Sequence, residues 1–400
     1  MTTDGATLVV NSGSSSVKFA LFTGESDAKR LLTGALERIG LADSRFHAID
    51  AKGVTVVDET GAIHDHAQAN QMLLKLLKWR PSSMSLRAVG HRVVHGGADC
   101  DCPVLVTPAL EARLRKLIPL APLHLPHNLA GVEAVRNIRP DLPQIACFDT
   151  AFHLALPRLA RLTGLPRRFE EEGIRRYGFH GLSYEYVIDE LGCRVSADSN
   201  GRLIVAHLGN GASMAAFRDG RCVETTMGLT TLAGLLMGTR TGDLDPGIVL
   251  YLLMEKGITT DQMQHILYRE SGLLGLSGLS RNMQELLALP DSKAAVEAIE
   301  FYCYRARKHL AALTAPLGGL DRLVFTGGIG ANAPEIRAKI CEGLAYLGIK
   351  LDRTRNNGGR SIISAESSSV VVEAFPTDEE LMIARHVRHV LAEQPAVQEA

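Results

Sequence analysis

The sequence predicts an α/β protein made of two similar domains, each with a mixed sheet flanked by helices. Residues 203–216 repeat the plan of residues 8–22, because each segment holds an apolar run, a turn of small polar residues and glycine, and a second apolar run. The chain of 400 residues is longer than one ordinary core requires. Its apolar content of 46% and charged content of 22% are typical of a globular protein. We therefore expect one domain over residues 1–150 and another over 151–382, with a helix at about 383–400 packing back on the first.

The first half of the chain alternates strand signals with helix signals. Residues 8–60 contain short apolar runs separated by turn residues, which is typical of strands. The remaining elements expected here are helices at Gln71–Trp79 and Thr107–Leu120 and strands at Ala88–Val94 and Gln144–Phe148. Asp149 directly follows the last of these strands.

The second half begins again with the hairpin pattern, and Asp219-Gly220 adds a turn signal after it. The elements expected next are helices at Ile248–Glu255, Thr260–Arg269 and Ser292–Ala315, a strand at Arg322–Phe325, a helix from about Pro334, a strand at Ser369–Ala374 and a C-terminal helix. Strands mixed with crossover helices are typical of the α/β class. We expect Glu393–Ala400 to fray.

Composition argues against several classes of protein. The formal net charge of −1 does not suit a protein built around nucleic acid, which needs a basic face. No apolar run approaches the length of a membrane span, and the N-terminal residues lack the basic and apolar regions of a signal peptide. The seven cysteines are scattered and only Cys100 and Cys102 are close, so we expect free thiols in a reducing cytoplasm.

Two hairpin turns suit phosphate binding, because turns of this kind expose backbone N–H groups. The first runs from Asn11 to Ser16 and is followed by Lys18, and the second is His207-Leu208-Gly209-Asn210-Gly211. Each turn by itself is also compatible with a solvated hairpin, and His207 with a satisfied core histidine. The chain contains no G-x-x-x-x-G-K-[ST] segment, which excludes a P-loop NTPase.

A third glycine segment, Gly327-Gly328-Ile329-Gly330, lies between an expected strand and an expected helix. It falls short of the G-x-G-x-x-G fingerprint, so it supports a nicotinamide site only weakly. Approach of the backbone to a nucleoside at the helix N-terminus fits this spacing better.

Charged groups in apolar or glycine-rich surroundings complete the pattern. Arg92 and Arg240 lie in segments that suit bidentate binding of carboxylate or phosphate, with a structural ion pair as the alternative for each. Asp149 at a strand end is a candidate site residue or a helix N-cap, and His180 a candidate site residue or a packing group. Three phosphate-type turns, two arginines, this aspartate and a late acidic pair together predict a phosphotransferase, because phosphoryl transfer needs metal, donors and cations around the moving group.

Ten motifs in order make the chain resemble the acetate kinase family over almost its whole length. They are Asn11–Lys18, His91–Gly97, Ala121–His124, Phe148–His153, Arg176–Gly181, His207–Ser213, Met237–Pro246, Ser271–Gly278, Phe325–Asn332 and Pro376–Leu381. The resemblance implies a duplicated actin-like (ribonuclease H-like) fold, an active site in the cleft between the domains, and a homodimer. It also implies ATP and ADP as nucleotide substrates, Mg²⁺ with Mn²⁺ able to substitute, and reversible phosphoryl transfer from ATP to acetate that gives ADP and acetyl phosphate.

The resemblance further implies roles for individual residues. Those that match catalytic residues are Arg92, Asp149, His180 and Arg240. Those that match the acetate site are Arg92, Val94, Leu123, His124 and Phe179, and those that match the magnesium site are Asn11 and Glu379. Those that match the ATP site are Ser14, Ser16, Lys18, His207, Leu208, Gly209, Asn210, Gly211, Asn282, Met283, Gln284, Gly328, Ile329, Gly330, Ala331 and Asn332.

The chain departs from the family pattern at its nucleoside and acyl contacts. Asn282 and Gln284 stand where the family usually has Asp and Arg, and Ala331 where it usually has Glu. Thr231 and Ala233 replace a usual Pro and Glu near the acyl pocket. These differences leave open a propionate kinase or an acetate kinase with another phosphoryl donor, such as pyrophosphate. A non-catalytic nucleotide-binding protein on the same fold is the alternative from another class.

Acid–base chemistry bears on the role of Asp149. A carboxylate acceptor is already ionised at pH 7, because carboxylic acids titrate near pH 4. We therefore expect Asp149 to position magnesium-bound water and an arginine rather than to act as a general base. Val94 is expected to crowd a longer acyl chain, and one methylene is worth about 1–3 kcal/mol of discrimination. Acetate is then the preferred acceptor, and propionate is accepted.

Overall fold

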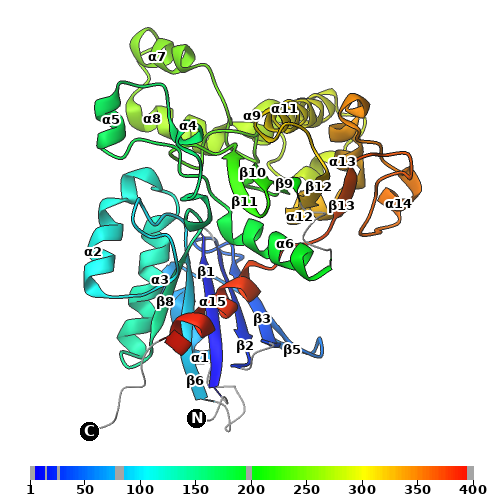
Figure 1. The fold of residues 1–400 in the computed structure, drawn as a ribbon. Coiled ribbons are helices and arrows are strands. Elements are labelled where there is room, and N and C mark those ends of the chain that lie inside the picture. Colours follow the sequence, from blue (N-terminus) through cyan, green and yellow to red (C-terminus); the bar gives the residue numbers. More distant parts are fainter. Residues whose placement is uncertain (1–4, 14–15, 25–27, 77–84, 195–200, 394–400) are drawn as a thin grey trace. The chain divides into compact units, whose positions relative to one another are not determined.

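The computed structural model describes residues 5–13, 16–24, 28–76, 85–194 and 201–393 (Figure 1). The chain divides into two compact units, Met1–Leu154 with Asp378–Ala400, and Ala155–Thr377. Both units combine a sheet with helices, and the predicted mixed α/β class is confirmed.

The first unit holds an eight-stranded sheet in the order β5-β4-β3-β2-β1-β6-β8-β7. Its strands are β1 (Gly5–Ser12), β2 (Ser16–Phe22), β3 (Arg30–Glu37), β4 (Arg45–Asp50), β5 (Thr55–Thr60), β6 (Ser85–Val93), β7 (Val104–Leu105) and β8 (Gln144–Phe148). Its helices are α1 (His66–Leu76), α2 (Pro108–Lys116), η2 (Ile118–Leu120), α3 (Leu125–Ile138), η3 (Ala151–His153) and α15 (Glu379–Glu393).

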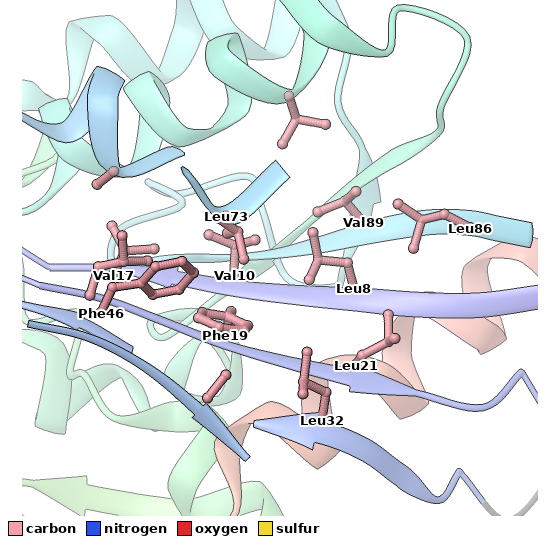
Figure 2. Packing of buried hydrophobic residues seen from close by; sticks show 14 of the residues in the cluster. Leu8, Val10, Val17, Phe19, Leu21, Leu32, Phe46, Leu73, Leu86 and Val89 are labelled. Carbon is pink, nitrogen blue, oxygen red and sulfur yellow. The ribbon is translucent and has the colours of Figure 1, made fainter. Parts of the chain in front are cut away.

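Helices cover both faces of this sheet at its centre. Successive strand residues point to opposite faces, and a Cβ on Gly90 would meet Ile383 of α15 at 2.5 Å. On the other face, a Cβ on Gly131 of α3 would lie 4.0 Å from the His91 ring. Figure 2 shows the core on one side of the sheet, where Val10 and Phe19 lie close to Leu73 of α1. The central strand β1 is therefore buried almost throughout.

The second unit holds a five-stranded sheet in the order β11-β10-β9-β12-β13. Its strands are β9 (Arg202–Leu208), β10 (Ala212–Arg218), β11 (Arg221–Thr225), β12 (Arg322–Thr326) and β13 (Val371–Ala374). Its helices are α4 (Arg158–Arg161), α5 (Arg167–Glu171), α6 (Gly181–Arg194), α7 (Pro246–Met254), α8 (Thr260–His265), the π-helical η5 (Ile266–Glu270), α9 (Gly272–Ser277), α10 (Met283–Leu287), α11 (Lys293–Leu317), α12 (Gly327–Asn332), α13 (Pro334–Cys341), η6 (Ala345–Leu347) and α14 (Arg353–Asn357).

The two sheets repeat one arrangement of five strands. In β3-β2-β1-β6-β8 and in β11-β10-β9-β12-β13, the first two pairings are antiparallel and the last two are parallel. The hairpins read from the sequence are the matching pairs, with Asn11 opposite Lys18 in one and Leu208 opposite Ala212 in the other. The internal repeat in the sequence is thus a repeat of structure.

Several elements differ from those expected from the sequence. Helices α3 and α6 were not expected, and the glycine segment expected as a turn after β12 is itself the short helix α12. The helix expected over Thr260–Arg269 ends at His265 and continues as the π-helical turn η5. The helix expected at Gln71–Trp79 begins earlier, at His66, and residues 77–79 lie outside the described residues. Among the described helices, none has the length and apolar character needed to cross a membrane.

Candidate active site

In the first unit, polar side chains gather where three parallel strands end. Asn11 lies near the end of β1, Arg92 near the end of β6, and Asp149 directly after β8. Because β1, β6 and β8 are parallel neighbours, their carboxyl ends share one edge of the sheet. The carboxyl edge of such a sheet is where α/β proteins bind ligands.

Arg92 is the centre of this cluster. Its Nε donates to Asp149 Oδ1 at 3.0 Å and its Nη2 to Oδ2 at 2.7 Å, which is a bidentate pair. Its Nη1 lies 2.7 Å from Oε2 of Glu379, the first residue of α15. Burial alone would lower the pKa of Arg92, but the charges of Asp149 and Glu379 outweigh it and raise that pKa. The guanidinium is therefore a permanent cation held between two carboxylates.

The cluster carries an excess of negative charge, which bears on whether a divalent cation fits it. The carboxylates of Asp149 and Glu379 both pair with the single guanidinium of Arg92, and a third carboxyl group, that of Glu380, directly follows Glu379 in the sequence. Burial, and then the neighbouring charge of Glu379, raise the pKa of Glu380. The described residues contain no preformed group of three or more His, Cys, Asp or Glu side chains. Mg²⁺ is typically held by one or two carboxylates together with substrate phosphates and water, so the oxygen donors of Asn11 and Glu379 fit that ion.

Two further buried residues hold the strand ends at this edge through hydrogen bonds to the backbone, and the sequence analysis did not identify either of them. Asn128 of α3 accepts from the backbone N–H of Val94 at 3.0 Å and donates to the carbonyl of Ser12 at 2.8 Å, so it ties the ends of β6 and β1 together. The hydroxyl of Thr150 accepts from the backbone N–H of Gly96 at 3.0 Å. The sequence analysis missed Asn128 because its two partners lie far from it in the sequence and because the helix that carries it was not expected.

The other predicted residues of this unit are less closely grouped. Val94 is buried next to the strand end, and Leu123 and His124 are half-buried just before α3. Ser16 is half-buried and Lys18 exposed on β2, while Ser14 lies outside the described residues. Phe179, the third residue expected in the acyl pocket, is buried in the second unit.

In the second unit, a histidine pair stands at the end of β9. The rings of His180 and His207 stack with their centroids 4.2 Å apart. His180 Nδ1 lies 2.8 Å from the hydroxyl of Ser213, and His207 Nδ1 lies 2.7 Å from the hydroxyl of Ser183. His180 has a φ of 59°, a left-handed conformation that costs a non-glycine residue on the order of 1 kcal/mol. Such local strain persists where surrounding contacts hold it, which is typical of functional sites.

Arg240 lies beside this pair and the second glycine turn. A Cβ on Gly211 would be 3.3 Å from His180 Nε2 and 3.9 Å from Arg240 Nη1, so the three residues are neighbours. Arg240 Nη1 donates to the carbonyl of Thr231 at 3.0 Å, and burial lowers the pKa of the guanidinium. Within the described part of the chain, no carboxylate forms an ion pair with Arg240. A half-buried cation without an anionic partner is suited to bind an anionic ligand.

A cavity of about 660 Å³ opens beside the second and third glycine segments. The segments adjoin because β9 and β12 are parallel neighbours, and a Cβ on Gly209 would lie 3.9 Å from the Gly328 nitrogen. Eight of the residues expected at the ATP site line the cavity: Gly209, Asn210, Asn282, Met283, Gln284, Gly328, Ile329 and Asn332. Arg281, Leu287, Ala333 and Glu335 complete the lining.

The remaining expected ATP residues of this unit do not line the cavity. Leu208 is fully buried, Gly330 is buried against the backbone of β9, and Ala331 lies on α12. Asn282 lines the cavity but also caps α10, because its Oδ1 accepts from the backbone N–H of Gln284 at 3.0 Å. Part of its hydrogen-bonding capacity is therefore already used within the protein.

Comparisons with known proteins agree with this fold. The family model described as the acetokinase family matches residues 6–385. An acetate kinase of Rhodopseudomonas palustris (strain ATCC BAA-98 / CGA009) is 51% identical over 389 residues, which cover 95% of this chain and 97% of the relative. One of Methylocella silvestris is 46% identical and covers 97% of this chain and 98% of the relative.

The matching solved structures likewise cover almost the whole length of this chain. The acetate kinase of Porphyromonas gingivalis superposes with a TM-score of 0.85 at 37% identity, covering 97% of this chain and 100% of that one. A propionate kinase of Francisella tularensis subsp. tularensis SCHU S4 superposes with a TM-score of 0.88 at 36% identity, covering 96% of this chain and 98% of that one. These matches confirm the predicted duplicated actin-like fold.

Fold and matches together define a kinase that transfers phosphate to a carboxylate. ATP or ADP is its nucleotide substrate, and a divalent metal takes part. The chain belongs to the acetokinase family, as its motifs predicted.

Proposed function

We propose that this chain catalyses the reversible transfer of a phosphoryl group from ATP to acetate, giving acetyl phosphate and ADP, with Mg²⁺ as the metal. The observation that carries the proposal is Arg240, a half-buried cation without an ion pair among the described residues, set beside His180 and the Gly211 turn. Phosphoryl transfer depends on such cations and donors around the moving group rather than on covalent chemistry by the protein.

In this proposal, Arg92 binds the carboxylate of the acceptor and Asp149 positions Arg92. The bidentate pair between them supports a positioning role for Asp149, because both carboxylate oxygens already accept from the guanidinium. Acetate has no proton to lose on attack at pH 7, so a general base is not required. Asp149 and Glu379 together fix the orientation of the guanidinium.

Arg240 and His180 stabilise the charge on the transferring group, and the turn of Gly209, Asn210 and Gly211 donates backbone N–H groups to phosphates. Asn11 and Glu379 would hold Mg²⁺. When bound, that ion would neutralise phosphate charge during transfer. Mn²⁺, with similar preferences for oxygen donors, would substitute.

The phosphoryl donor is proposed to be a nucleotide rather than pyrophosphate. The cavity of about 660 Å³ beside Gly209 and Gly328 has the volume of an ordinary small-molecule site and far exceeds the need of pyrophosphate alone. Most of the residues expected to contact ATP in this unit line it. In this proposal, Gln284 and Arg281 contact the nucleoside.

Propionate is the competing acceptor, since a propionate kinase is among the matching structures. We propose that acetate is preferred, because Val94 is buried at the strand end and crowds a longer chain. One methylene changes binding by only about 1–3 kcal/mol, so propionate remains a slower substrate. We further propose that the protein acts as a homodimer in the cytoplasm, where its seven cysteines, none of which forms a disulfide in the structure, would stay reduced.

The test is direct. The purified protein is incubated with Mg²⁺, with ATP or pyrophosphate as donor, and with acetate or propionate as acceptor, and acyl phosphate is trapped as hydroxamate. ATP with acetate is expected to give the highest kcat/KM. A higher kcat/KM with propionate or pyrophosphate would assign the rival substrate, and no acyl phosphate from any pairing would leave a non-catalytic nucleotide-binding protein.

A further inference from the structure

Helix α6 begins directly after His180 and places two buried hydroxyl groups near the histidine pair. Ser183 and Tyr184 are adjacent residues of its first turn, and both side chains are fully buried. The Ser183 hydroxyl lies 2.7 Å from His207 Nδ1. The backbone N–H of Tyr184 donates to the carbonyl of His180 at 3.1 Å, so α6 also holds the backbone of His180 in its left-handed conformation.

Ser213 of β10 connects the Tyr184 side chain to His180. Its hydroxyl lies 2.8 Å from His180 Nδ1 and 2.5 Å from the Tyr184 hydroxyl. Ser213 stands opposite His207 in the pairing of β9 with β10, and its side chain is fully buried. The three side chains therefore form a buried hydrogen-bonded chain, Tyr184–Ser213–His180, that ends at the imidazole.

The donors in this chain follow from the chemistry of its hydroxyl groups. Ser213 has one hydroxyl proton, so it can donate to only one of its two partners. A phenol is a stronger donor and a weaker acceptor than an aliphatic hydroxyl, because the lone pair on its oxygen is delocalised into the ring. Burial raises the pKa of Tyr184, so the phenol keeps the proton that it donates. Tyr184 therefore donates to Ser213, and Ser213 donates to His180 Nδ1.

An imidazole that accepts at Nδ1 carries its proton on Nε2. In a neutral histidine, the hydrogen bond at one ring nitrogen decides which nitrogen holds the proton. His180 Nε2 lies beside the Gly211 turn, because a Cβ on Gly211 would be 3.3 Å from Nε2 and 3.9 Å from Arg240 Nη1. A second proton, on Nδ1, would break the hydrogen bond from Ser213 and add a positive charge beside Arg240. The ring thus presents a neutral N–H donor next to the guanidinium.

We propose that Tyr184 and Ser213 are positioning residues that hold His180 in the tautomer with its proton on Nε2, so that Nε2 donates to the transferring phosphoryl group. The tautomer rests on the geometry, whereas its effect on the rate rests on the proposed function. The oxygens of a phosphoryl group carry negative charge throughout the transfer, so they require donors. The other tautomer would direct the lone pair of an unprotonated Nε2 at these oxygens, and the site would lose one donor.

Nitrogen-15 NMR of histidine-labelled protein at neutral pH tests the tautomer. A ring nitrogen that carries a proton resonates far from one that does not, and the His180 signals are identified by their absence from His180→Gln. The wild type is expected to show a proton on Nε2 and none on Nδ1. In Tyr184→Phe, the Ser213 hydroxyl loses its donor and can accept from Nδ1, so a mixture of tautomers is expected. A wild-type ring with a proton on Nδ1 would overturn the proposal, as would a Tyr184→Phe ring identical to that of the wild type.

Kinetics test whether the tautomer matters for the transfer. Tyr184→Phe is expected to lower kcat about 3- to 10-fold, the scale of one net hydrogen bond, with the KM values for ATP and acetate unchanged. Ser213→Ala is expected to lower kcat further, by up to about 100-fold, as when one donor to a transition state is lost. The matched control is Tyr302→Phe on α11, because Tyr302 is equally buried and its hydroxyl has no hydrogen-bond partner among the described residues. That variant is expected to keep the wild-type kcat, and equal kcat values for Tyr184→Phe and Tyr302→Phe would overturn the effect on the rate.

The double variant separates positioning from packing, and circular dichroism verifies that each variant is folded. Because Tyr184 acts on His180 through Ser213, adding Tyr184→Phe to Ser213→Ala is expected to cause no further decrease in kcat. A decrease equal to the product of the two single effects would overturn the connection through Ser213. If Ser213→Ala does not fold, the spectra of the wild type and of Tyr184→Phe still decide the tautomer. If the wild type forms no acyl phosphate, the proposed function fails, and the same spectra still decide the tautomer.

Discussion

Replacing Asp149 with Asn removes the negative charge of one of the two carboxylates that pair with Arg92, and it preserves the size and most of the shape of the Asp149 side chain. In the structure, the carboxylate of Asp149 is 1% exposed and accepts from Arg92 at 3.0 and 2.7 Å. Glu379 still holds the guanidinium at 2.7 Å in the variant, so the site loses one of two anchors rather than its cation. The substitution therefore tests positioning separately from the presence of Arg92.

The magnitude follows from the geometry of the pair. Two unit charges about 4 Å apart attract by about 4 kcal/mol at an effective dielectric constant of about 20. The side-chain amide introduced by the Asp149→Asn substitution still accepts a hydrogen bond through its oxygen, which retains part of this energy. We expect a loss of about 2–4 kcal/mol in transition-state stabilisation, which is roughly a 30- to 1000-fold decrease in kcat/KM.

The assay is hydroxamate trapping of acyl phosphate at several pH values from mildly acidic to mildly alkaline. A positioning role predicts a lower rate with an unchanged shape of the pH–rate profile and a raised KM for acetate or for Mg²⁺. The matched control is Asp141→Asn, which removes a bidentate partner of Arg139 on the exposed surface and is expected to leave activity unchanged. Loss of an ionisation from the profile, with acetate and Mg²⁺ affinities unchanged, would refute the reasoning and assign Asp149 as a general base.

Three further predictions concern one residue each. Arg240→Ala is expected to lower kcat/KM at least 100-fold, about 2.7 kcal/mol, in hydroxamate assays; a loss under about tenfold would remove it from the site. Burial lowers the pKa of His91 from 6.5 to about 4, and the hydrogen bond that its Nε2 donates to Oε1 of Gln144 only partly opposes this shift. The unfolded chain then binds a proton on this histidine more tightly than the folded chain does. The contribution of His91 to the free energy of unfolding is therefore full above pH 6.5 and falls by roughly 3 kcal/mol as the pH drops toward 4. In urea unfolding at pH 4 and above pH 6.5, the difference in the free energy of unfolding is expected to be smaller for His91→Gln than for the wild type, and an equal difference would contradict the assignment. Gly90→Ala would place a Cβ 2.5 Å from Ile383 and is expected to destabilise the protein by about 1–3 kcal/mol in urea unfolding. The control is Gly61→Ala, whose added Cβ would have no atom within 4 Å and which is expected to leave the free energy of unfolding unchanged. Equal stabilities of the two variants would argue against close packing of α15 on β6.

The sequence predicted best what local pattern determines. The hairpins at β1-β2 and β9-β10 have continuous apolar runs on either side of clear turn residues, and strand Gln144–Phe148 matches β8 at both ends. Arg92 and Asp149 were each recognisable as isolated charges, and the structure joins them in one ion pair. Their motifs had been matched to a family, but spacing alone does not show that two residues 57 positions apart form a pair.

The sequence missed what tertiary contacts determine. Helix α3 contains Gly131, a poor helix former, and the structure explains it, because a Cβ there would lie 2.9 Å from the Ser12 hydroxyl. Helix formation in α3 thus depends on packing against β1, which no local window contains. Asn128 was missed for the same reason. The three glycines of Gly327–Asn332 favoured a turn, whereas in the structure they are the first turns of α12 against β9.

The position of α15 has a consequence for synthesis of the protein on the ribosome. This helix covers one face of the first sheet and supplies Glu379 to Arg92, yet it is the last of the described elements in chain order (Figure 1). At about 5–20 residues per second, translation from Phe148 to Glu379 takes roughly 10–50 s. The second unit, continuous from Ala155 to Thr377, is fully translated in that interval. The nascent first unit waits with an apolar sheet face uncovered and Arg92 lacking one anchor, so chaperone contact with the nascent chain is expected at that face.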